Sequence, residues 1–444
     1  MKKGYLYIAM LILFAMAAGF IVVKQKDKTI SFYPLQNRKN ISAQTGEWEK
    51  VKKNFDGLMK MIATNPDDSN SRIALSTLYI QEARITGNYM YYDQAAMKYV
   101  NEVLEKNPMN FQALSFKSLL YLSQHHFADG LAFAEKAQKN NPYNAFVYGL
   151  LVDGNVETGN YKAAIEYADK MVSIRPDIRS YSRISYLREI HGDYPGAIEA
   201  MKMATEAGQT GDETTEWSRV QLGHLYENTG DLKNAEMYYT IALQNRPDYA
   251  YALAGLGRLS LASTDYGKAV HYFLQADSLV NDYSFKEELI DVYQLSDQKN
   301  KADSISAIVI NAMNKDAQSG KDNQNIGHYA DRELAYAYLK TNNYDKALEH
   351  ALAEYNRRPG NIDVNETVAW IYYKKGDYKK ALPYMQVALK TNSKNPTLLC
   401  RAGLIYAKIG DSMKAKVFLQ EGLKNNPNIN EKLKQESIML LQTL

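Results

Sequence analysis

The feature that most constrains this chain is a sequence period of 34 residues. Near the C-terminal end, alanine recurs at Ala347, Ala381 and Ala415, each 34 positions after the one before. A short polar turn sequence precedes each of these alanines. Self-similarity at a fixed period of about 20 to 50 residues is typical of stacked repeats, in which each unit buries its apolar face only against its neighbours.

Each period predicts two helices. In residues 216–249, a first helix over Trp217–Asn228 is followed by a second over Leu232–Gln244, whose apolar residues recur every three or four positions. Gly230 ends the first helix because glycine accepts the left-handed backbone that a helix stop needs. Pro247 closes the unit because proline cannot continue a helix. Aligned units begin near residues 70, 111, 145, 178, 216, 250, 283, 328, 362 and 396.

Small residues recur where two helices must cross closely. The eighth position of the units carries Gly223, Gly257, Ala335, Ala369 and Gly403, and the eleventh carries Tyr121, Tyr226, Tyr293, Tyr338, Tyr372 and Tyr406. These positions, with the alanine of the second helix and the closing proline, resemble the tetratricopeptide repeat family over roughly residues 45–429. The resemblance implies an all-α, right-handed superhelical solenoid of about ten helix-turn-helix units, with the first helix of each unit on the concave side.

Four segments are expected along the chain. Residues 1–23 contain an uncharged apolar run and predict an N-terminal apolar helix, which is either a cleaved signal peptide or a retained transmembrane anchor. Residues 24–44 predict a polar tether, 45–429 the solenoid and 430–444 an amphipathic capping helix. Within the solenoid, the polar stretch 316–327 predicts a loop or a hinge.

The first segment also sets the expected location. We expect a bacterial protein that contacts the membrane through residues 1–23, and the exported, periplasmic side is favoured over the cytoplasmic side. The oligomeric state is not predicted.

Composition and motifs exclude several classes of function. The 53 basic and 50 acidic residues nearly cancel, which argues against a nucleic-acid partner. Cys400 is the single cysteine, so neither an intramolecular disulfide nor a site with two thiolates from this chain can form. Gly255 and Gly257 lie within a predicted helix, not in a phosphate loop, and the adjacent His125 and His126 do not share a helix face. We therefore predict no catalytic residue, cofactor or metal, and no enzyme activity.

A partner-binding surface is predicted on the concave side of the solenoid. Aromatic and charged residues fall at the positions of the first helices that face this side in the repeat family, and such residues anchor peptides well. The predicted concave residues are Arg179, Tyr186, Glu189, Trp217, His224, Tyr251, Arg258, Arg332, Tyr336, Trp370 and Tyr373, together with Arg183, which lies one position away from this pattern.

The predicted function is that of a non-catalytic scaffold or adaptor, which binds a peptide or a partner protein in the concave groove. One alternative is an assembly subunit of an envelope complex that uses its convex face. A remote alternative is an enzyme whose site is built from residues far apart in the sequence.

Overall fold

The structure is a computed structural model that describes residues 33–39, 46–322, 327–426 and 429–444. The chain divides into two compact units, Met1–Asn37 and Arg38–Leu444. All of the described helices belong to the second unit. Its described residues are helical with no β-strand, so the all-α prediction is confirmed.

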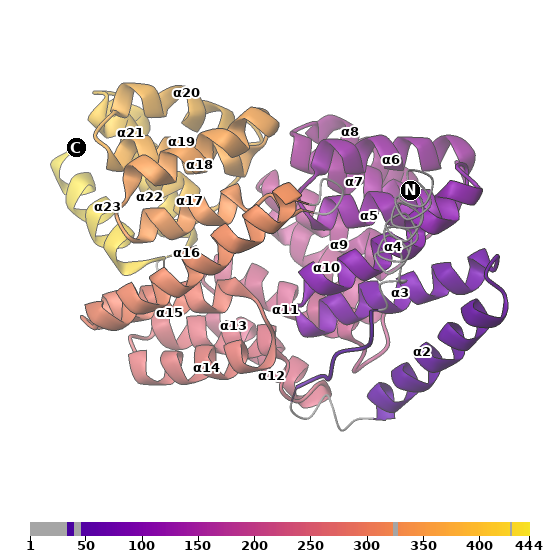
Figure 1. Ribbon diagram of the computed structural model, residues 1–444. Coiled ribbons are helices and arrows are strands. Elements are labelled where there is room, and N and C mark those ends of the chain that lie inside the picture. Colours follow the sequence, from indigo (N-terminus) through magenta and orange to yellow (C-terminus); the bar gives the residue numbers. More distant parts are fainter. Residues whose placement is uncertain (1–32, 40–45, 323–326, 427–428) are drawn as a thin grey trace, which may run out of the picture. The chain divides into compact units, whose positions relative to one another are not determined.

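Ten consecutive helix pairs make up the unit, preceded by α2 (Gly46–Thr64) and followed by α23 (Glu431–Thr443), as the colours of Figure 1 trace. The pairs are α3 (Ser69–Thr86) with α4 (Tyr89–Lys106), α5 (Phe111–Ser123) with α6 (Phe127–Asn140), α7 (Ala145–Thr158) with α8 (Tyr161–Ile174), α9 (Ile178–Ile190) with α10 (Tyr194–Glu206), α11 (Glu213–Asn228) with α12 (Leu232–Asn245), α13 (Ala250–Ala262) with α14 (Tyr266–Leu279), α15 (Tyr283–Leu295) with α16 (Lys299–Asp322), α17 (Asp331–Lys340) with α18 (Tyr344–Arg357), α19 (Ile362–Lys374) with α20 (Tyr378–Ala388), and α21 (Pro396–Lys408) with α22 (Ser412–Asn425).

The first helix of each pair begins within three residues of the start that the period predicts. Two pairs are longer than the rest. Helices α3 and α4 have 18 residues each, and α16 has 24. Of the stretch 316–327, for which the sequence offers a loop or a hinge, residues 316–322 are not a loop but continue α16, and the hinge alternative stays a prediction. A polar helix is stable there because Asp316 accepts a hydrogen bond from the Tyr283 hydroxyl (2.9 Å) and Ala317 packs on an apolar cluster.

A residue with left-handed backbone lies in the turn between the two helices of every pair. Six of these turns use glycine, at Gly87, Gly159, Gly192, Gly230, Gly376 and Gly410. The other four use His125, Thr264, Asp297 and Asn342, with φ between 58° and 63°. Glycine adopts this conformation without strain, whereas a histidine or threonine side chain makes it costly.

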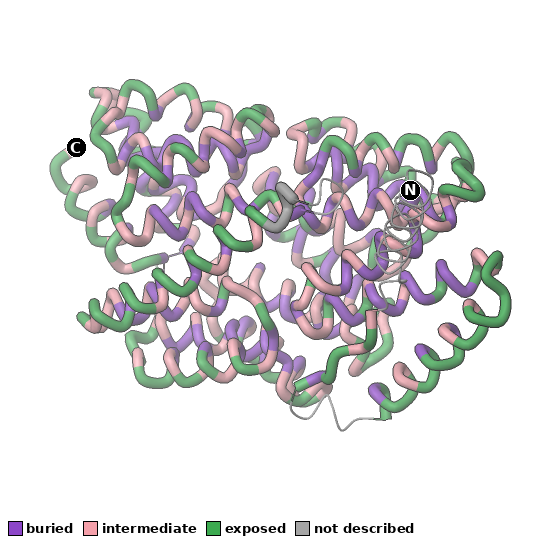
Figure 2. The backbone as a smooth tube through the Cα atoms, in the orientation of Figure 1, coloured by how far each residue is buried: buried purple, intermediate pink, exposed green. Residues whose placement is uncertain are grey.

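Close helix crossings explain the recurrent small residues. The Tyr239 ring is fully buried between α11 and α13, and a Cβ at either Gly223 or Gly255 would lie 2.6 Å from its Cε1 atom. Ala235 has no exposed surface, like the alanines at the same position of the later pairs. Buried and exposed residues accordingly alternate along each helix in Figure 2. The packing of neighbouring pairs is thus set by the 34-residue period.

A second set of contacts joins pairs that are far apart in the sequence, and we call it the seam. It links turns of the early pairs to loops 195 to 205 residues further on. The contacts include Arg246 to Glu47, Asn281 N–H to Thr86 O (3.2 Å), Tyr329 N–H to Gln124 O (3.2 Å), His126 to Gly327 O, Arg358 to Glu157, Asn361 Nδ2 to Glu157 O (3.1 Å), and Asn426 Nδ2 to Glu227 O (3.0 Å). The solenoid therefore packs against itself.

Two expectations concern the N-terminal region. Arg38, which the sequence assigns to the polar tether, is 4% exposed, and its guanidinium pairs with Glu82 and Glu47 and lies over the Trp48 ring. The ion pair with Glu82 thus holds Arg38 against the helical unit, and the tether over 24–44 stays a prediction, since most of it lies outside the described residues. The predicted apolar helix lies outside the described residues. None of the described helices has the length and apolarity needed to cross a membrane.

Candidate functional site: the first-helix faces

Several predicted concave residues are paired with one another or with acidic neighbours from adjacent pairs. Arg183 on α9 donates two hydrogen bonds to Asp153 on α7, at 2.8 and 2.6 Å. Arg258 on α13 contacts both carboxylate oxygens of Glu227 on α11, at 3.0 and 3.1 Å, and donates to the Tyr239 hydroxyl. These cations hold consecutive first helices in register.

The charges of these ion pairs are set by burial and by the pairing itself. Burial opposes ionisation of Glu227, but Arg258 and His224 outweigh it and hold the pKa of that carboxyl well below its ordinary value. Burial instead raises the pKa of Glu288, which lies 4.0 Å from Arg258. Arg258 already contacts the carboxylates of Glu227 and Glu288, so its guanidinium is less available to bind a partner.

Tyr186 and Arg332 differ from these paired residues. The Tyr186 side chain is 39% exposed. Its hydroxyl nevertheless has a raised pKa, mainly because many protein atoms lie around it. The ring therefore faces a space that is surrounded by protein. Arg332 is exposed and has no ion pair or hydrogen bond from its side chain within the described residues. Burial disfavours its charged form, while the acidic groups of nearby residues keep its pKa above the ordinary value.

These two side chains share electrostatic neighbours although they belong to distant pairs. Glu157 of α7 and Asp363 of α19 each act on both of them. Burial raises the pKa of Glu157 in turn. Tyr186 of α9 and Arg332 of α17 therefore both lie within electrostatic reach of the same two carboxylates, and both keep exposed surface.

Trp370 and Tyr373 lie elsewhere. Both are 6% exposed, and their rings stack 4.9 Å apart. The Tyr373 hydroxyl donates to Glu436 on α23 at 2.6 Å, and Arg401 lies over the Trp370 ring. These two aromatics therefore pack the C-terminal end of the unit, where little of either ring is left to meet a partner.

The remaining predicted residues have mixed surroundings. Trp217 is half-buried against the apolar cluster of its own pair, and the Tyr251 hydroxyl donates to Asp282 at 3.2 Å. Glu189 accepts a hydrogen bond from Asn228, and Tyr336 accepts one from Thr367. Two further residues are more open: Arg179 is exposed beside the Phe146 ring, and the His224 side chain is 41% exposed.

Three further acidic residues of this surface are not among those predicted from the sequence. Asp153, Glu157 and Asp363 occupy the same repeat positions as the arginines and aromatics that were singled out. Applying the positional rule to every polar residue would have found all three. Repeat position alone does not predict which acidic residue forms an ion pair with which arginine of a neighbouring first helix.

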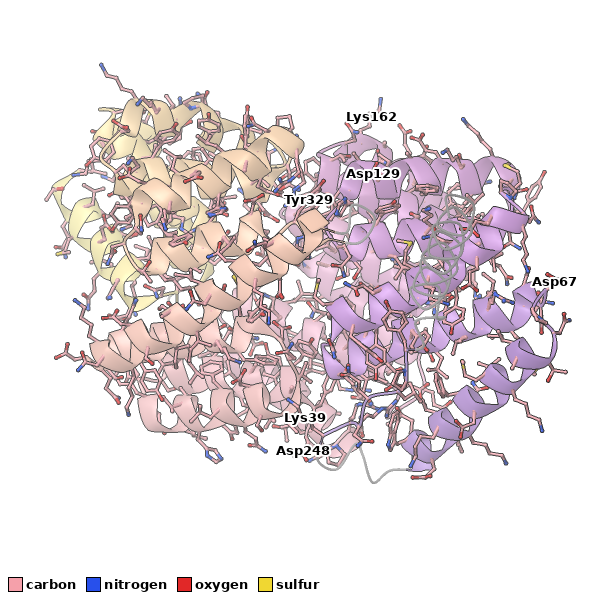
Figure 3. All side chains as sticks on the ribbon, viewed as in Figure 1. Lys39, Asp67, Asp129, Lys162, Asp248 and Tyr329 are labelled. Atoms are coloured by element: carbon pink, nitrogen blue, oxygen red, sulfur yellow. The ribbon has the colours of Figure 1, made fainter. Side chains whose placement is uncertain are left out.

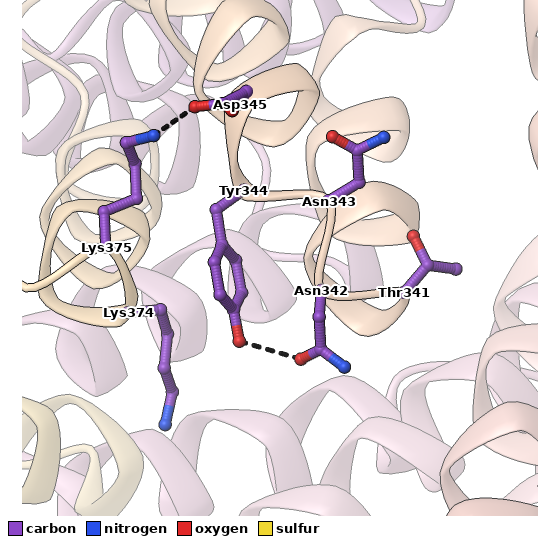
Figure 4. A pocket seen from close by; sticks show the side chains of 7 residues that line it. All are labelled: Thr341, Asn342, Asn343, Tyr344, Asp345, Lys374 and Lys375. Carbon is purple, nitrogen blue, oxygen red and sulfur yellow. Dashed lines mark hydrogen bonds and ion pairs between the residues drawn. The ribbon is translucent and has the colours of Figure 1, made fainter.

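A depression on the surface lies away from these residues. It has a volume of about 550 Å³ and is lined by residues 341–345 with Lys374 and Lys375. Figure 4 shows that its polar groups already bind each other: Tyr344 donates to Asn342, and Lys375 pairs with Asp345. Because it is open and internally satisfied, it is a weaker candidate than the first-helix faces.

The seam also gathers a group that could hold a metal ion. His125 in the α5–α6 turn meets His328 and Glu333, and their ligand atoms all lie within 4.8 Å of one another. Burial lowers the pKa of His125 to about 3, which keeps its imidazole neutral. Burial opposes ionisation of Glu333, but electrostatic attraction to His328, His125 and Arg332 outweighs it and lowers the pKa of that carboxyl to about 2. The sequence neighbours of His125 could not reveal this group, because its partners lie about 200 positions away.

Family models support the repeat that the period indicates. Models described as tetratricopeptide repeat match residues 220–282, 362–395 and 396–429. These repeats generally mediate protein–protein interactions, and their fold is typically a non-catalytic scaffold. A search of curated proteins finds no match.

Several solved structures are similar to this chain at low identity. They include PilW, a widely conserved type IV pilus biogenesis factor (16% identity, covering 45% of this chain and 91% of that chain, TM-score 0.38). Another is YrrB, a TPR protein with an unusual peptide-binding site (20%, 42% and 94%, TM-score 0.29). A third is the human IFIT1 dimer with PPP-AAAA (13%, 80% and 80%, TM-score 0.48). At these values the likeness concerns helix-repeat architecture and says nothing about what this chain binds.

Proposed function

We propose that this protein is a non-catalytic adaptor that binds an extended peptide segment of a partner protein along its first-helix faces. The observation that carries the proposal is that Tyr186 and Arg332, which are both exposed, lie within electrostatic reach of the same two carboxylates, Glu157 and Asp363. An exposed arginine without an ion pair among the described residues, in a place largely enclosed by protein, offers a strong anchor for a carboxylate. Tyr186, an exposed tyrosine near the same two carboxylates, offers apolar area and a hydroxyl.

The chemistry of the surroundings narrows the ligand. Glu157 and Asp363 lie close enough to act on both residues, so a segment with only negative charge would be repelled there. We therefore propose a segment with one acidic side chain or a terminal carboxylate for Arg332, flanked by apolar or basic residues. The membrane contact and the periplasmic location expected from residues 1–23 remain part of this proposal.

A peptide selection on the purified full chain tests the proposal. Peptides recovered from a random display library would be measured for affinity by calorimetry against the wild type, Tyr186→Ala and Arg332→Ala. We expect each substitution to weaken binding by about tenfold or more, since buried aromatic and arginine anchors contribute at least about 1–2 kcal/mol.

The matched control is Tyr143→Ala, because Tyr143 is 83% exposed in the loop between α6 and α7. Its loss should leave peptide affinity unchanged. Peptides that bind all variants equally would move the binding surface away from Tyr186 and Arg332. The convex-face alternative would then become the better account of the protein.

A further inference from the structure

We infer that His125, His328 and Glu333 form a binding site for a divalent transition-metal ion, of which Zn²⁺ is the best fit, and that this ion clamps the seam. Two imidazole nitrogens and one carboxylate oxygen are a ligand set that zinc uses in proteins, with a fourth position left for water. The inference is independent of the proposed peptide site.

The distances suit such an ion. His125 Nδ1 lies 3.6 Å from Glu333 Oε1, and His328 Nε2 lies 3.8 Å from Glu333 Oε2. In a tetrahedral site with metal–ligand bonds of about 2.0–2.2 Å, ligand atoms lie about 3.3–3.6 Å apart. The longest separation in the group, up to 4.8 Å, therefore has to close by about an ångström. Side-chain rotation of this size needs no movement of the helices.

Unsatisfied polar atoms point to a missing partner. Glu333 Oε2 is buried and has no hydrogen-bond donor among the described residues. His125 Nδ1 faces two oxygens, Glu333 Oε1 and the Tyr329 carbonyl at 3.3 Å, whereas one proton on this nitrogen serves only one of them. A cation at the centre would satisfy the carboxylate and the imidazoles together, and buried polar atoms rarely stay unpaired.

The backbone holds the ligands in place. The Tyr329 N–H donates to Gln124 O at 3.2 Å, beside His125. The His126 ring bonds the Gly327 carbonyl and stacks 3.9 Å from the Tyr329 ring, which is labelled in Figure 3. Residues on both sides of two ligands are thus fixed before any ion binds, as a well-organised metal site requires.

The backbone of His125 supports a role for its side chain. Its φ is 63°, at the turn position where six of the ten pairs have glycine. A histidine in the left-handed region is strained relative to glycine, and such strain is often kept where a side chain has a task. Here the strained turn points the imidazole toward His328 and Glu333.

Charged residues around the three ligands both oppose and favour a positive charge at this site. Arg332 and Arg358 oppose a positive charge at His125, while Glu333 favours it. Asp93, 2% exposed on α4, lies close enough to His328 to act on it electrostatically. The side chains of His125, His328 and Glu333 keep 19%, 22% and 26% of their surface, so an ion can enter from solvent.

The test is zinc binding by the full-length chain after treatment with a chelator. Calorimetric titration with ZnCl₂ should give one site in the wild type, and Co²⁺ should give the visible absorption of a tetrahedral site. His328→Ala and Glu333→Gln should each lower Zn²⁺ affinity about 10- to 100-fold or more. His271→Ala, an exposed histidine on α14, should bind like the wild type.

A second measurement separates a clamp from a loosely bound ion. Zn²⁺ should raise the melting temperature of the wild type and slow hydrogen exchange at residues 124–126 and 327–333, and neither effect should appear in Glu333→Gln. Circular dichroism confirms that each variant keeps its helices. The inference is overturned if the wild type binds no Zn²⁺, or if the folded His328→Ala and Glu333→Gln variants bind it as tightly as the wild type.

Discussion

The interior of a helix pair and the seam are packed with different chemistry. Inside the pairs, Tyr239 and Ala235 are fully buried among apolar and small residues that recur with the period. At the seam, contacts are made by arginine–glutamate pairs, asparagine side chains, histidines and glycine backbone, and their kind changes along the seam. The comparison shows that the repeat builds its core from recurrent apolar and small residues, whereas closure against distant repeats relies on a mixture of polar contacts.

The largest expected effect comes from breaking the interior. Ala235→Glu would place an unpaired carboxylate at a helix crossing with no exposed surface, at a cost of at least about 4 kcal/mol. Hydrogen exchange should rise first in α11, α12 and α13, because each repeat depends on its neighbours. Glu236→Ala, at an exposed position next to it, is the control. A normal unfolding midpoint for Ala235→Glu would mean that the packing described for this pair is wrong.

A somewhat smaller effect is expected from the buried cation of the seam. Arg358 is 3% exposed and pairs with Glu157 across the seam and with Glu354 on its own helix. Arg358→Ala should destabilise by about 3 kcal/mol because buried carboxylates lose their partner. Denaturant unfolding of Arg358→Ala, Glu157→Gln and the double variant measures the coupling, expected at about 1–3 kcal/mol. Additive effects would remove this pair from the forces that close the seam.

A pH-dependent effect is expected from Asp93, whose carboxylate accepts hydrogen bonds from Ser123 and Gln124 beside the seam. Burial raises its pKa from 3.8 to about 6, so the folded state holds a proton that the unfolded state has released. Stability from this group is therefore full below about pH 4 and is lost as pH rises to about 6. Asp93→Asn should remove up to about 2–3 kcal/mol of that dependence and make the protein more stable at pH 7.

Equal stability of Asp93→Asn and the wild type at pH 7, with the same slope between pH 4 and 6, would contradict the raised pKa. Unfolding midpoints in urea, measured at three pH values, are sufficient for this comparison.

The smallest expected effect comes from one matched pair of glycine substitutions, one at the seam and one away from it. Gly159 and Gly376 occupy the same turn position with φ of 85° and 80°. An added Cβ at Gly159 would collide with the backbone of Gly360, whereas one at Gly376 meets nothing within 4 Å. Gly376→Ala should cost about 1 kcal/mol for the backbone strain alone, and Gly159→Ala about 1–2 kcal/mol more. The difference in thermal stability between the two variants measures the contribution of the seam contact at Gly159. Equal losses of stability would show that the turn at Gly159 can shift to accommodate a Cβ.

The two regions also differ in how far the sequence predicted them. The period located the helix pairs because Gly223, Ala235 and their counterparts recur where packing demands small residues. It also identified the first-helix positions that carry Arg183, Arg258 and Tyr186. The seam could not be predicted in this way, because Glu157 and Arg358 or His125 and His328 are joined by the curvature of the whole solenoid. A sum of small rotations over several repeats leaves no local pattern in the residues.

The seam has a consequence for how the chain matures on the ribosome. The turn at Gly159 leaves the exit tunnel before residue 360 has been made, and synthesis at about 5–20 residues per second separates the two by about 10–40 seconds. Early repeats can pack on their immediate neighbours during this interval. Their turns, however, have no seam partners until the second half of the chain has been translated. Translation speed and early chaperone binding would therefore affect the yield of closed molecules more than that of an open repeat array of the same length.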